Sequence, residues 1–598
     1  MIGKPDRAAS ERAAQLLAEK EEEKKKKSRK GTRLAKQTIS FGNVVELASS
    51  SDTDGISELA CEEPSSSSSL ITIDTKELKR KVLLNVAREA ERYKMSNREV
   101  SAICNALLTD LGLISLENED LIFDKSKIHR IREKLRKGLF ESLDAPRKPI
   151  EGLEYDGRKD KTLVRNESSG GIRLEKEKHF SVLRQPGRNF LTHFTPATGG
   201  SEDICAELLQ IITQKSLTGC IKVLACDSTN VNTGHLNGVN VRLERELDHR
   251  LLWLVCMLHT NELPMRHLMT ALDGPTTGKD SFRGPIGRAA KQANTLDAKT
   301  FQAIPVETDM RELPEDIVKD LSSDQKFLYQ ITKAVRSGSA PQKLYGTKIG
   351  PMDHSRWVTL ANRILRLYIS DHSLTGLAMR NLETLATFIV AHYAPMWFEI
   401  KCEPLYKDGP KHVLTSVKLF KLLPTAIKTI VEPSIRRNSY FAHSENILMA
   451  MVADTEQNKR KKVVEIIEKL RQGDIFGDHS VRPFKVPTVN FDAEEYEDLI
   501  DWNDRIYEPI ITAELGIFNI RNIVNQRLFI GKFECHTQSI ERTVKEVTKA
   551  SRAVVGRERR DGCIEATLTS RKLHPKSNTK KDFLGLLRND ALTSDDDN

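Results

Sequence analysis

Three acidic residues stand where their carboxylates could hold divalent metal ions. Asp227 directly follows a short apolar run in the stretch IKVLACDSTNVNTG, so it lies at the end of a predicted buried strand. Asp156 lies in an earlier predicted strand, GLEYDGRKDKTLV, and Glu541 lies in a predicted helix near the C-terminus. Magnesium prefers carboxylate oxygens, and two ions roughly 3.5–4 Å apart need several of them. The chemistry open to such a set is two-metal attack at a phosphate.

The segments around these acids predict a mixed sheet. Continuous apolar strands separated by helices indicate parallel strands that are covered on both faces. The predicted elements are, in order, strands over 152–164, 178–185 and 189–196, a helix over 201–213, a strand over 221–226, a helix over 239–248 and a strand over 251–257. This is the connectivity of the RNase H-like fold, in which the first and fourth strands are parallel neighbours. Asp156 and Asp227 would then meet at the carboxyl edge of the sheet.

The third carboxylate would come from a helix that packs on this sheet. The segment 534–551 is amphipathic, with Ile540, Val544 and Val547 on one stripe and Glu541 beside it. The predicted fold class is therefore α/β, an RNase H-like five-stranded mixed sheet interrupted by a large all-α insertion. The expected domains are a disordered tail over 1–70, a helical module over 74–142, core segments over 150–274 and 530–570 around an α-helical insertion over 275–520, and a disordered tail over 571–598.

Three helices are expected before the sheet, and the last is basic. The second begins at a capping box formed by Ser96 and Glu99, and its apolar residues, expected to be buried, include Val100, Ile103, Leu107, Leu108 and Leu111. A small bundle with a basic last helix resembles a helix-turn-helix module that binds double-stranded DNA. A solvated basic face is the other interpretation. The residues expected to contact DNA are Lys125, Lys127, Arg130, Arg132, Lys134, Arg136 and Lys137.

Short motifs in the order found here resemble those of the hAT superfamily of DNA transposases. They are Asp-Gly in YDGRKD, Asp followed by Asn in CDSTNVNTG, Cys-x-x-His before Asn-x-Leu in CMLHTNEL, Arg-Trp in SRWVTLANRIL, and SIER, a partial match to a late Ser-Glu-Arg motif. In SIER, Ile540 intervenes between Ser539 and Glu541. The resemblance covers roughly residues 150–570, and no BED-type zinc finger precedes it.

The resemblance implies strand cleavage and transfer of DNA, with Asp156, Asp227 and Glu541 holding two Mg²⁺ or Mn²⁺ ions. It also implies that His259 contacts the substrate phosphate. Arg356 and Trp357 are expected at the DNA, with Trp357 stacking on an extruded base. Burial of Trp357 in the core is the alternative.

Two further acids and two motifs leave alternatives open. Asp156 could instead be a turn residue, with Asp160 as its substitute, and Asp273 is the rival of Asp227. We assign no metal to Cys256 and His259, because no second pair lies at zinc-ligand spacing. The stretch GPTTGKDS lacks the spacing of a phosphate-binding loop, which argues against a nucleotide hydrolase.

The composition suits an intracellular protein, and the basic charge suits a polyanionic partner without requiring one. The formal net charge is +9. The basic cluster from Lys24 to Lys30 fits a nuclear localisation signal and a nuclear location, and a solvated charged tail is the other interpretation. No run approaches the roughly 18 apolar residues of a membrane span, so no membrane association is expected. The nine cysteines form no C-x-x-C pair, which indicates neither a disulfide framework nor a classical zinc finger.

Three functions remain open from the sequence alone. The first is a transposase or nuclease that uses three acids and two metal ions. The second is a transposon-derived DNA-binding protein that no longer cuts, and the third is an interaction scaffold with no DNA role. A homo-oligomer is left open, and the sequence does not determine the oligomeric state.

Overall fold

The computed structural model of the 598-residue chain describes 75–114, 121–142, 150–165, 170–353, 357–472, 488–502, 507–509, 512, 516, 519–522 and 533–573. The chain divides into two units, Met1–Thr72 and Ile73–Asn598, and all described residues belong to the second. The disorder predicted for residues 1–70 lies outside the described residues. So does that predicted for the C-terminal tail, except that 571–573 end a helix.

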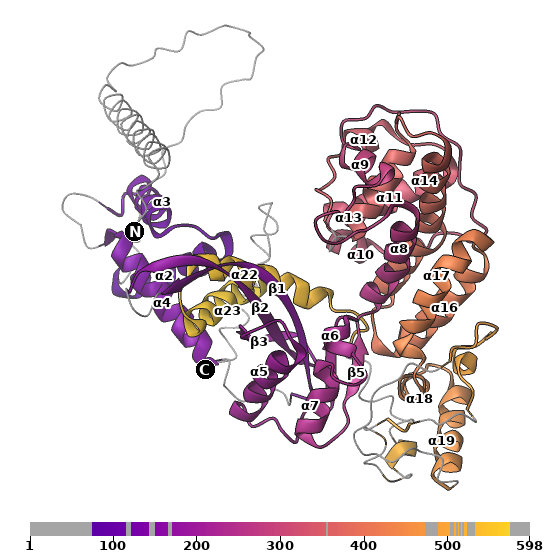
Figure 1. The fold of residues 1–598 in the computed structure, drawn as a ribbon. Helices are drawn as coiled ribbons and strands as arrows, with labels where there is room; N and C mark the ends of the chain where they lie inside the picture. Colours follow the sequence, from indigo (N-terminus) through magenta and orange to yellow (C-terminus); the bar gives the residue numbers. More distant parts are fainter. Residues whose placement is uncertain are drawn as a thin grey trace, which may run out of the picture. The chain divides into compact units, whose positions relative to one another are not determined.

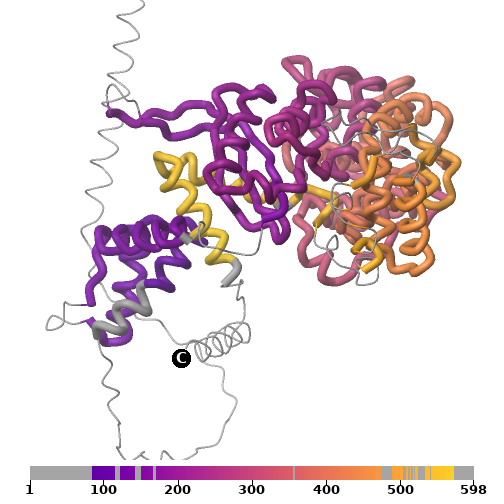
Figure 2. Tube along the Cα trace, turned by 90° about the horizontal axis from the view of Figure 1, so that it is seen from below, coloured from indigo at the N-terminus to yellow at the C-terminus, as the bar shows by residue number. Residues whose placement is uncertain are grey.

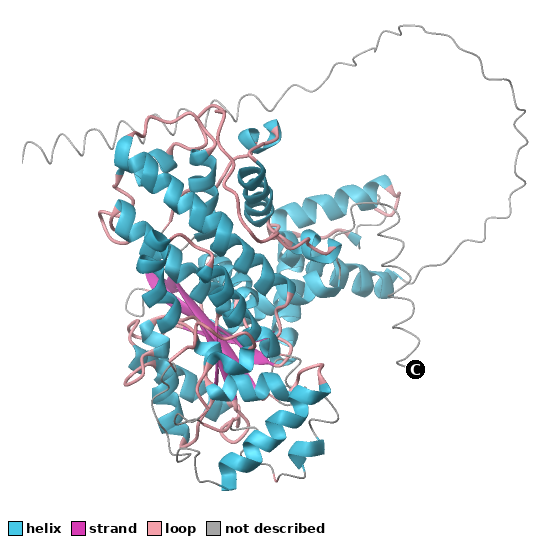
Figure 3. Ribbon diagram, turned by 90° about the vertical axis from the view of Figure 1, so that its right-hand side faces the viewer, coloured by secondary structure: helices cyan, strands magenta, loops and turns pink. Residues whose placement is uncertain are grey.

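The strands form one five-stranded mixed sheet with the order β3-β2-β1-β4-β5. The strands are β1 (Gly152–Arg165), β2 (Ile172–Gln185), β3 (Asn189–Phe194), β4 (Val223–Cys226) and β5 (Leu252–Val255). β2 is antiparallel to β1 and β3, while β4 is parallel to β1 and β5. Figure 3 shows the strands gathered among many helices. The predicted α/β class, the mixed sheet and the pairing of the first strand with the fourth are confirmed.

The two faces of the sheet carry different helices, because side chains alternate along each strand. On one face, Leu153 and Tyr155 of β1 belong to an apolar cluster with α5 (Ser201–Gln214) and α7 (Val239–Leu247). On the other, Leu183 of β2 joins Ile540 and Val544 of α22 (Gln538–Ala553). Figure 1 shows α22 running beside β1 and β2. The late helix therefore returns to the strands that open the sheet.

Between β5 and α22 the described chain is mostly helical. One large apolar cluster joins these helices to each other. They are α8 (Met257–Asp273), α9 (Pro285–Lys291), α10 (Glu315–Asp320), α11 (Ser323–Ser337), α12 (Gln342–Gly346), α13 (Trp357–Tyr368), α14 (Gly376–Phe388), a π-helical turn (Ile389–Tyr393), α15 (Ala394–Cys402), α16 (Gly409–Lys421), α17 (Thr425–Arg437), α18 (Ser444–Val452) and α19 (Gln457–Gln472).

The early helices are α2 (Thr75–Tyr93), α3 (Asn97–Asp110) and α4 (Lys125–Ser142). α2 and α4 lie against the last helix, α23 (Arg557–Leu573), while α3 packs on α4. The approach of α4 to α23 is close, since a Cβ on Gly562 would lie 2.7 Å from the Arg136 carbonyl oxygen. The predicted capping box is confirmed, with the Glu99 N–H donating to Ser96 Oγ and the Ser96 N–H to Glu99 Oε2. Two of the three N-terminal helices, α2 and α4, therefore pack against the C-terminal end of the described chain.

The predicted buried face of α3 is partly wrong. Val100 and Leu108 are buried, but Ile103, Leu107 and Leu111 are 56%, 57% and 61% exposed. The small apolar cluster of this bundle, which also contains Ala90, Phe123 and Ile128, reaches only one edge of the helix. The neighbouring helices therefore cover only part of the apolar stripe that the periodicity of α3 predicts.

Candidate active site

Asp156 lies within β1 and not in a turn. It pairs with Ser181 of β2, and Gly157 pairs with Phe180. The glycine is required because a Cβ at this position would lie 2.6 Å from the Phe180 ring. The Asp156 side chain is half-buried, and its Oδ1 accepts a hydrogen bond of 2.7 Å from the Gly157 N–H. Burial raises the pKa of Asp156 to about 8, and other carboxylates add to the rise.

Asp227 directly follows β4 and is held by the residues after it. Its Oδ1 accepts hydrogen bonds from the Thr229 N–H at 3.0 Å, the Thr229 hydroxyl at 2.7 Å and the Asn232 amide at 2.6 Å. These donors lie at or in the short helix α6 (Asn230–Thr233). Among the described residues no donor reaches the second oxygen, Oδ2, of this half-buried side chain. Thr229 and Asn232 therefore fix one oxygen of Asp227 and leave the other available.

Glu541 lies in the first turn of α22, beside a residue that anchors the helix on the sheet. Ile540 is fully buried, whereas the Glu541 side chain is exposed to solvent. Burial raises the pKa of Glu541, while Lys545 and Arg542 lower it. The Glu541 side chain is nevertheless reached by solvent. Many protein atoms lie around the carboxylate, which disfavours its charged form, but they leave its surface open.

The structure brings the three predicted acids within electrostatic reach of each other. After burial, Asp227 and then Glu541 are the next causes that raise the pKa of Asp156. Asp227 also raises the pKa of Glu541. These residues come from β1, the end of β4 and α22, as the connectivity predicts. Over the described ranges, however, no three His, Cys, Asp or Glu side chains are grouped closely enough to hold a metal ion. The acids converge without forming a closed metal cage.

Glu154 is an acid near this site that sequence reasoning missed. It is 1% exposed, and its Oε2 accepts a hydrogen bond of 2.6 Å from the Gln185 amide. Burial raises the pKa of Glu154 to about 7, although Arg188 and Gln185 favour the charged form. Glu541 raises it further. The signal was present, because residues two apart on a strand share a face and Glu154 precedes Asp156 by two.

Glu262 and His259 share one face of α8, since residues three apart on a helix are neighbours. Burial raises the pKa of Glu262 well above its usual range, and Glu541 raises it further. Burial lowers the pKa of His259 although Asp227 opposes the change, so the imidazole is neutral at pH 7. The motif CMLHTNEL thus places a neutral histidine and a fifth acid, Glu262, near the predicted site, and Glu262 is a second acid that sequence reasoning missed.

Cys256 ties this region together by hydrogen bonds. Its Sγ accepts from the Thr537 N–H at 3.3 Å, and its own N–H donates to the Cys226 carbonyl at 2.9 Å. The Met257 N–H donates to the Cys535 carbonyl at 2.8 Å. Burial raises the pKa of Cys256 to about 12, which keeps it a thiol. The cysteine of this motif therefore anchors the segment before α22 at the end of β5.

The two rival acids serve other purposes. Asp160 is buried, with one oxygen bound by Arg552 at 2.7 Å and the other by Thr548 at 2.8 Å and Arg158 at 3.0 Å. Asp273 accepts from the first two backbone N–H groups after the Pro that opens α9, at 2.8 and 2.7 Å. Both oxygens of each carboxylate are engaged, so these two acids stabilise packing and a helix start.

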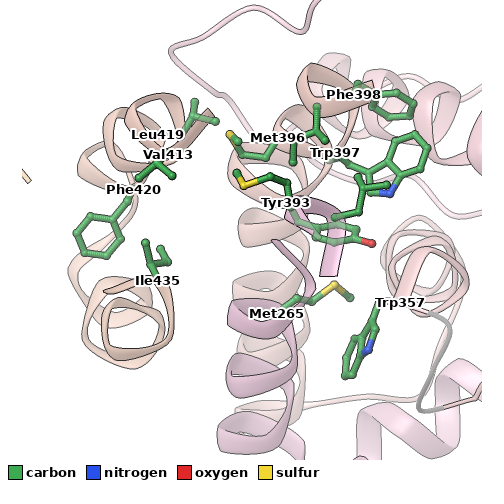
Figure 4. Packing of buried hydrophobic residues seen from close by; sticks show 14 of the residues in the cluster. Met265, Trp357, Tyr393, Met396, Trp397, Phe398, Val413, Leu419, Phe420 and Ile435 are labelled. Atoms are coloured by element: carbon green, nitrogen blue, oxygen red, sulfur yellow. The ribbon is translucent and has the colours of Figure 1, made fainter. Parts of the chain in front are cut away.

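Trp357 lies in the helical region and is 7% exposed. It belongs to the large apolar cluster together with Met265 and Tyr393, which Figure 4 shows as sticks. This burial favours the packing role over the base-stacking role. Arg356 lies outside the described residues.

The basic helix α4 exposes only part of its charge. Lys125, Arg130, Lys134 and Lys137 are exposed and Lys127 is half-buried. The expectation that Arg132 and Arg136 also face outward is wrong. Both form ion pairs with Glu91, at 2.7 and 2.8 Å, and Glu91 is 0% exposed. A buried carboxylate on α2 turns these two guanidinium groups inward, because a buried charge needs a partner.

Comparison with known proteins gave no assignment: no protein-family model matches this chain, and no curated protein sequence matches it. Among the helices of the described residues, none has both the length and the apolar character to cross a membrane.

Proposed function

We propose that the protein is a transposase-like enzyme that cleaves and transfers DNA strands with Asp156, Asp227 and Glu541 as its catalytic carboxylates. The observation that carries this proposal is the convergence of acids from β1, the end of β4 and α22, close enough that Asp227 and Glu541 raise the pKa of Asp156 and Asp227 raises that of Glu541. Structural acids such as Asp160 have cationic partners instead. Unbalanced carboxylates with perturbed pKa values are typical of functional sites.

An RNase H-like core of the hAT type is the fold that we propose for this site. The order of strands along the chain, the order within the sheet and the return of α22 to β1 and β2 support it. The helices over 275–520 would be the insertion, and the nucleus would be the location of an enzyme that acts on DNA. The cluster from Lys24 to Lys30, which fits that location, lies outside the described residues.

The donor set fits two Mg²⁺ or Mn²⁺ ions in its chemistry. All three side chains offer hard oxygens, and their like charges raise the pKa of Asp156 and Glu541, a cost that divalent cations would offset. Oδ2 of Asp227 and the exposed carboxylate of Glu541 are available as ligands. When bound, such ions activate a water or a 3′-hydroxyl and stabilise the leaving oxygen.

The chain's own residues orient this set. Thr229 and Asn232 fix Oδ1 of Asp227, and the Gly157 N–H fixes Oδ1 of Asp156. Neutral His259, near Asp227, can donate one hydrogen bond to a substrate phosphate without adding a counter-charge to the acids.

A second candidate is a transposon-derived DNA-binding protein that does not cut. One observation favours it: within the described part of the chain, no three ligand side chains stand close enough together to hold an ion. Under this alternative the acids would remain in place without forming a working site.

Metal-dependent nicking of DNA separates the two candidates. The Asp227→Asn variant keeps the shape of the side chain but removes its charge, so we expect nicking with Mg²⁺ or Mn²⁺ to fall to background while DNA binding stays. Asp273→Asn is the matched control, because that carboxylate caps α9, and it should still nick. The reverse result would refute the assignment of Asp227. A wild-type protein that binds DNA but never nicks it would favour the second candidate.

A further inference from the structure

The outer half of the β1–β2 hairpin is a two-stranded ribbon. β4 pairs with β1 only over 152–154, and β3 pairs with β2 only over 180–184. Beyond these residues β1 and β2 pair with each other out to Arg165 and Ile172. Figure 2 shows the two purple strands running out together from the sheet. In this part of the hairpin, therefore, no other described strand pairs with the outer edge of either β1 or β2.

One face of the ribbon carries four lysines in two opposed pairs. Lys159 pairs with Lys178, and Lys161 pairs with Lys176, so each pair points to the same side. Three of the side chains are exposed and Lys178 is half-buried, with its Nζ 4.8 Å from the centre of the Phe180 ring. None of the four forms an ion pair with another described residue. We call these four residues the lysine quartet.

The opposite face of the ribbon is different, because its charges are matched. There Arg158 pairs with Asp160, which also binds Arg552 of α22. His179 contacts the Thr162 hydroxyl, and Arg173 pairs with Glu175. Only the face with the lysine quartet lacks carboxylates.

Opposed like charges on neighbouring strands weaken a hairpin. The quartet places two such pairs next to each other, and residues two apart on a strand lie only about 7 Å apart. An external polyanion would offset this repulsion. The repulsion among the four lysines therefore destabilises the free hairpin. Relief of this repulsion would favour the binding of a negatively charged ligand.

Aliphatic side chains continue the same face beyond the quartet. Leu174, opposite Leu163, and Ile172 are 53% and 59% exposed. A two-stranded ribbon fits the major groove of DNA, and apolar side chains beside basic ones also serve as wedges in the minor groove. A membrane surface would require a broader apolar face than these residues supply.

We propose that the lysine quartet binds the phosphate backbone of duplex DNA. This inference rests on the proposed function only in taking DNA as the partner. By strand alternation the quartet faces away from Asp156, so it holds a length of duplex outside the site of cleavage.

The test is the salt dependence of DNA binding by a variant with all four lysines replaced by glutamine (K159Q, K161Q, K176Q and K178Q). The affinity for a labelled duplex of random sequence is measured in EDTA between about 50 and 200 mM salt by fluorescence anisotropy. Four lost phosphate contacts should reduce the slope of log K against log salt by about 3.6. Over this fourfold range the wild type should therefore lose about 150-fold more affinity than the variant.

The matched control replaces four exposed lysines outside the hairpin, Lys291, Lys299, Lys343 and Lys348, with glutamine. It has the same net charge as the quartet variant and should keep the wild-type slope. Removing opposed charges should not lower the melting temperature of the quartet variant. If that variant nevertheless fails to fold, the double variant K161Q/K176Q should reduce the slope by about 1.8.

An unchanged slope in the quartet variant, or an equal loss in the control, would overturn the inference. So would loss of binding to phosphatidylserine vesicles with unchanged binding to DNA, which would indicate a membrane partner. Nicking is scored separately. A wild type that nicks DNA with an unaffected quartet slope refutes only this inference. A wild type that binds through the quartet but never nicks supports it and contradicts the proposed function.

Discussion

Replacing Arg132 with alanine should loosen the N-terminal helices. The side chain is 7% exposed, and its Nε lies 2.7 Å from Oε1 of Glu91. Its Nη1 donates to the Met95 carbonyl at 2.8 Å and to the Asn97 side chain at 2.7 Å. The variant therefore removes one buried ion pair and two further hydrogen bonds that join α4 to α2 and to the start of α3.

The expected cost follows from this burial. Breaking a buried ion pair by removing one partner costs about 3–5 kcal/mol. Arg136 stays on Glu91 at 2.8 Å, so the lower end of that range applies. Since about 1.4 kcal/mol is a factor of ten, amide exchange through local opening of α2 and α4 should become about 150-fold faster.

Hydrogen exchange followed by mass spectrometry of peptides from α2 and α4 measures this effect. Arg130→Ala is the control, because Arg130 lies on the same helix but is exposed. It should leave exchange unchanged and only reduce the salt dependence of DNA binding. Equal exchange rates in the Arg132→Ala variant and the wild type would refute the structural role of Arg132.

Two further predictions concern stability. Gly157→Ala should lower the melting temperature, with a cost of about 1–3 kcal/mol, because the added Cβ would lie 2.6 Å from the Phe180 ring; an unchanged melting temperature would contradict the close packing. Burial lowers the pKa of His392 to about 4, so the unfolded chain binds the proton more readily and stability falls as the pH drops from about 6.5 towards 4. By pH 5 this amounts to about 2 kcal/mol, and His392→Gln should flatten that part of a plot of melting temperature against pH, whereas a parallel plot would refute the assignment.

The sheet could be predicted from the sequence because its signals are local. β4 and β5 are short apolar runs, and the Gln185-Pro186-Gly187 stretch marks the turn between β2 and β3. The rules of strand connection then restrict the order of strands to few choices. The three acids could be chosen because each lies in or beside a segment with a recognisable apolar pattern. Asp156 lies in the first strand, Asp227 directly follows the fourth strand, and Glu541 follows Ile540 on an amphipathic helix.

The N-terminal helices show what periodicity cannot decide. Ile103 and Leu107 follow a helical apolar pattern as closely as Val100 does, but only Val100 faces a neighbour. Arg132 resembles any exposed residue of a basic helix until Glu91 is placed opposite it, and that glutamate is 41 residues away in the sequence. Burial of these side chains depends on which helices meet, which the local pattern does not contain.

The missed residues of the candidate site have a similar explanation. Glu154 shares a strand face with Asp156, but its burial against Gln185 requires the register of β1 with β2. Glu262 shares a helix face with His259, but its nearness to Glu541 requires the return of α22. Asp160 could be set aside in favour of Asp156 only from contacts such as those of Thr548 and Arg552, which lie 388 and 392 residues later in the sequence.

The hydrogen bond between Cys256 and Thr537 joins residues 281 positions apart, just before the helix that carries Glu541. At about 5–20 residues per second, a ribosome needs roughly 15–55 s to make the chain between them. During that time the first two acids exist without the third. The Ser570 hydroxyl, which binds the Arg88 carbonyl at 2.8 Å, is made later still. Assembly of the three acids is therefore a late event in synthesis, and a chain truncated within the helical region would carry Asp156 and Asp227 alone.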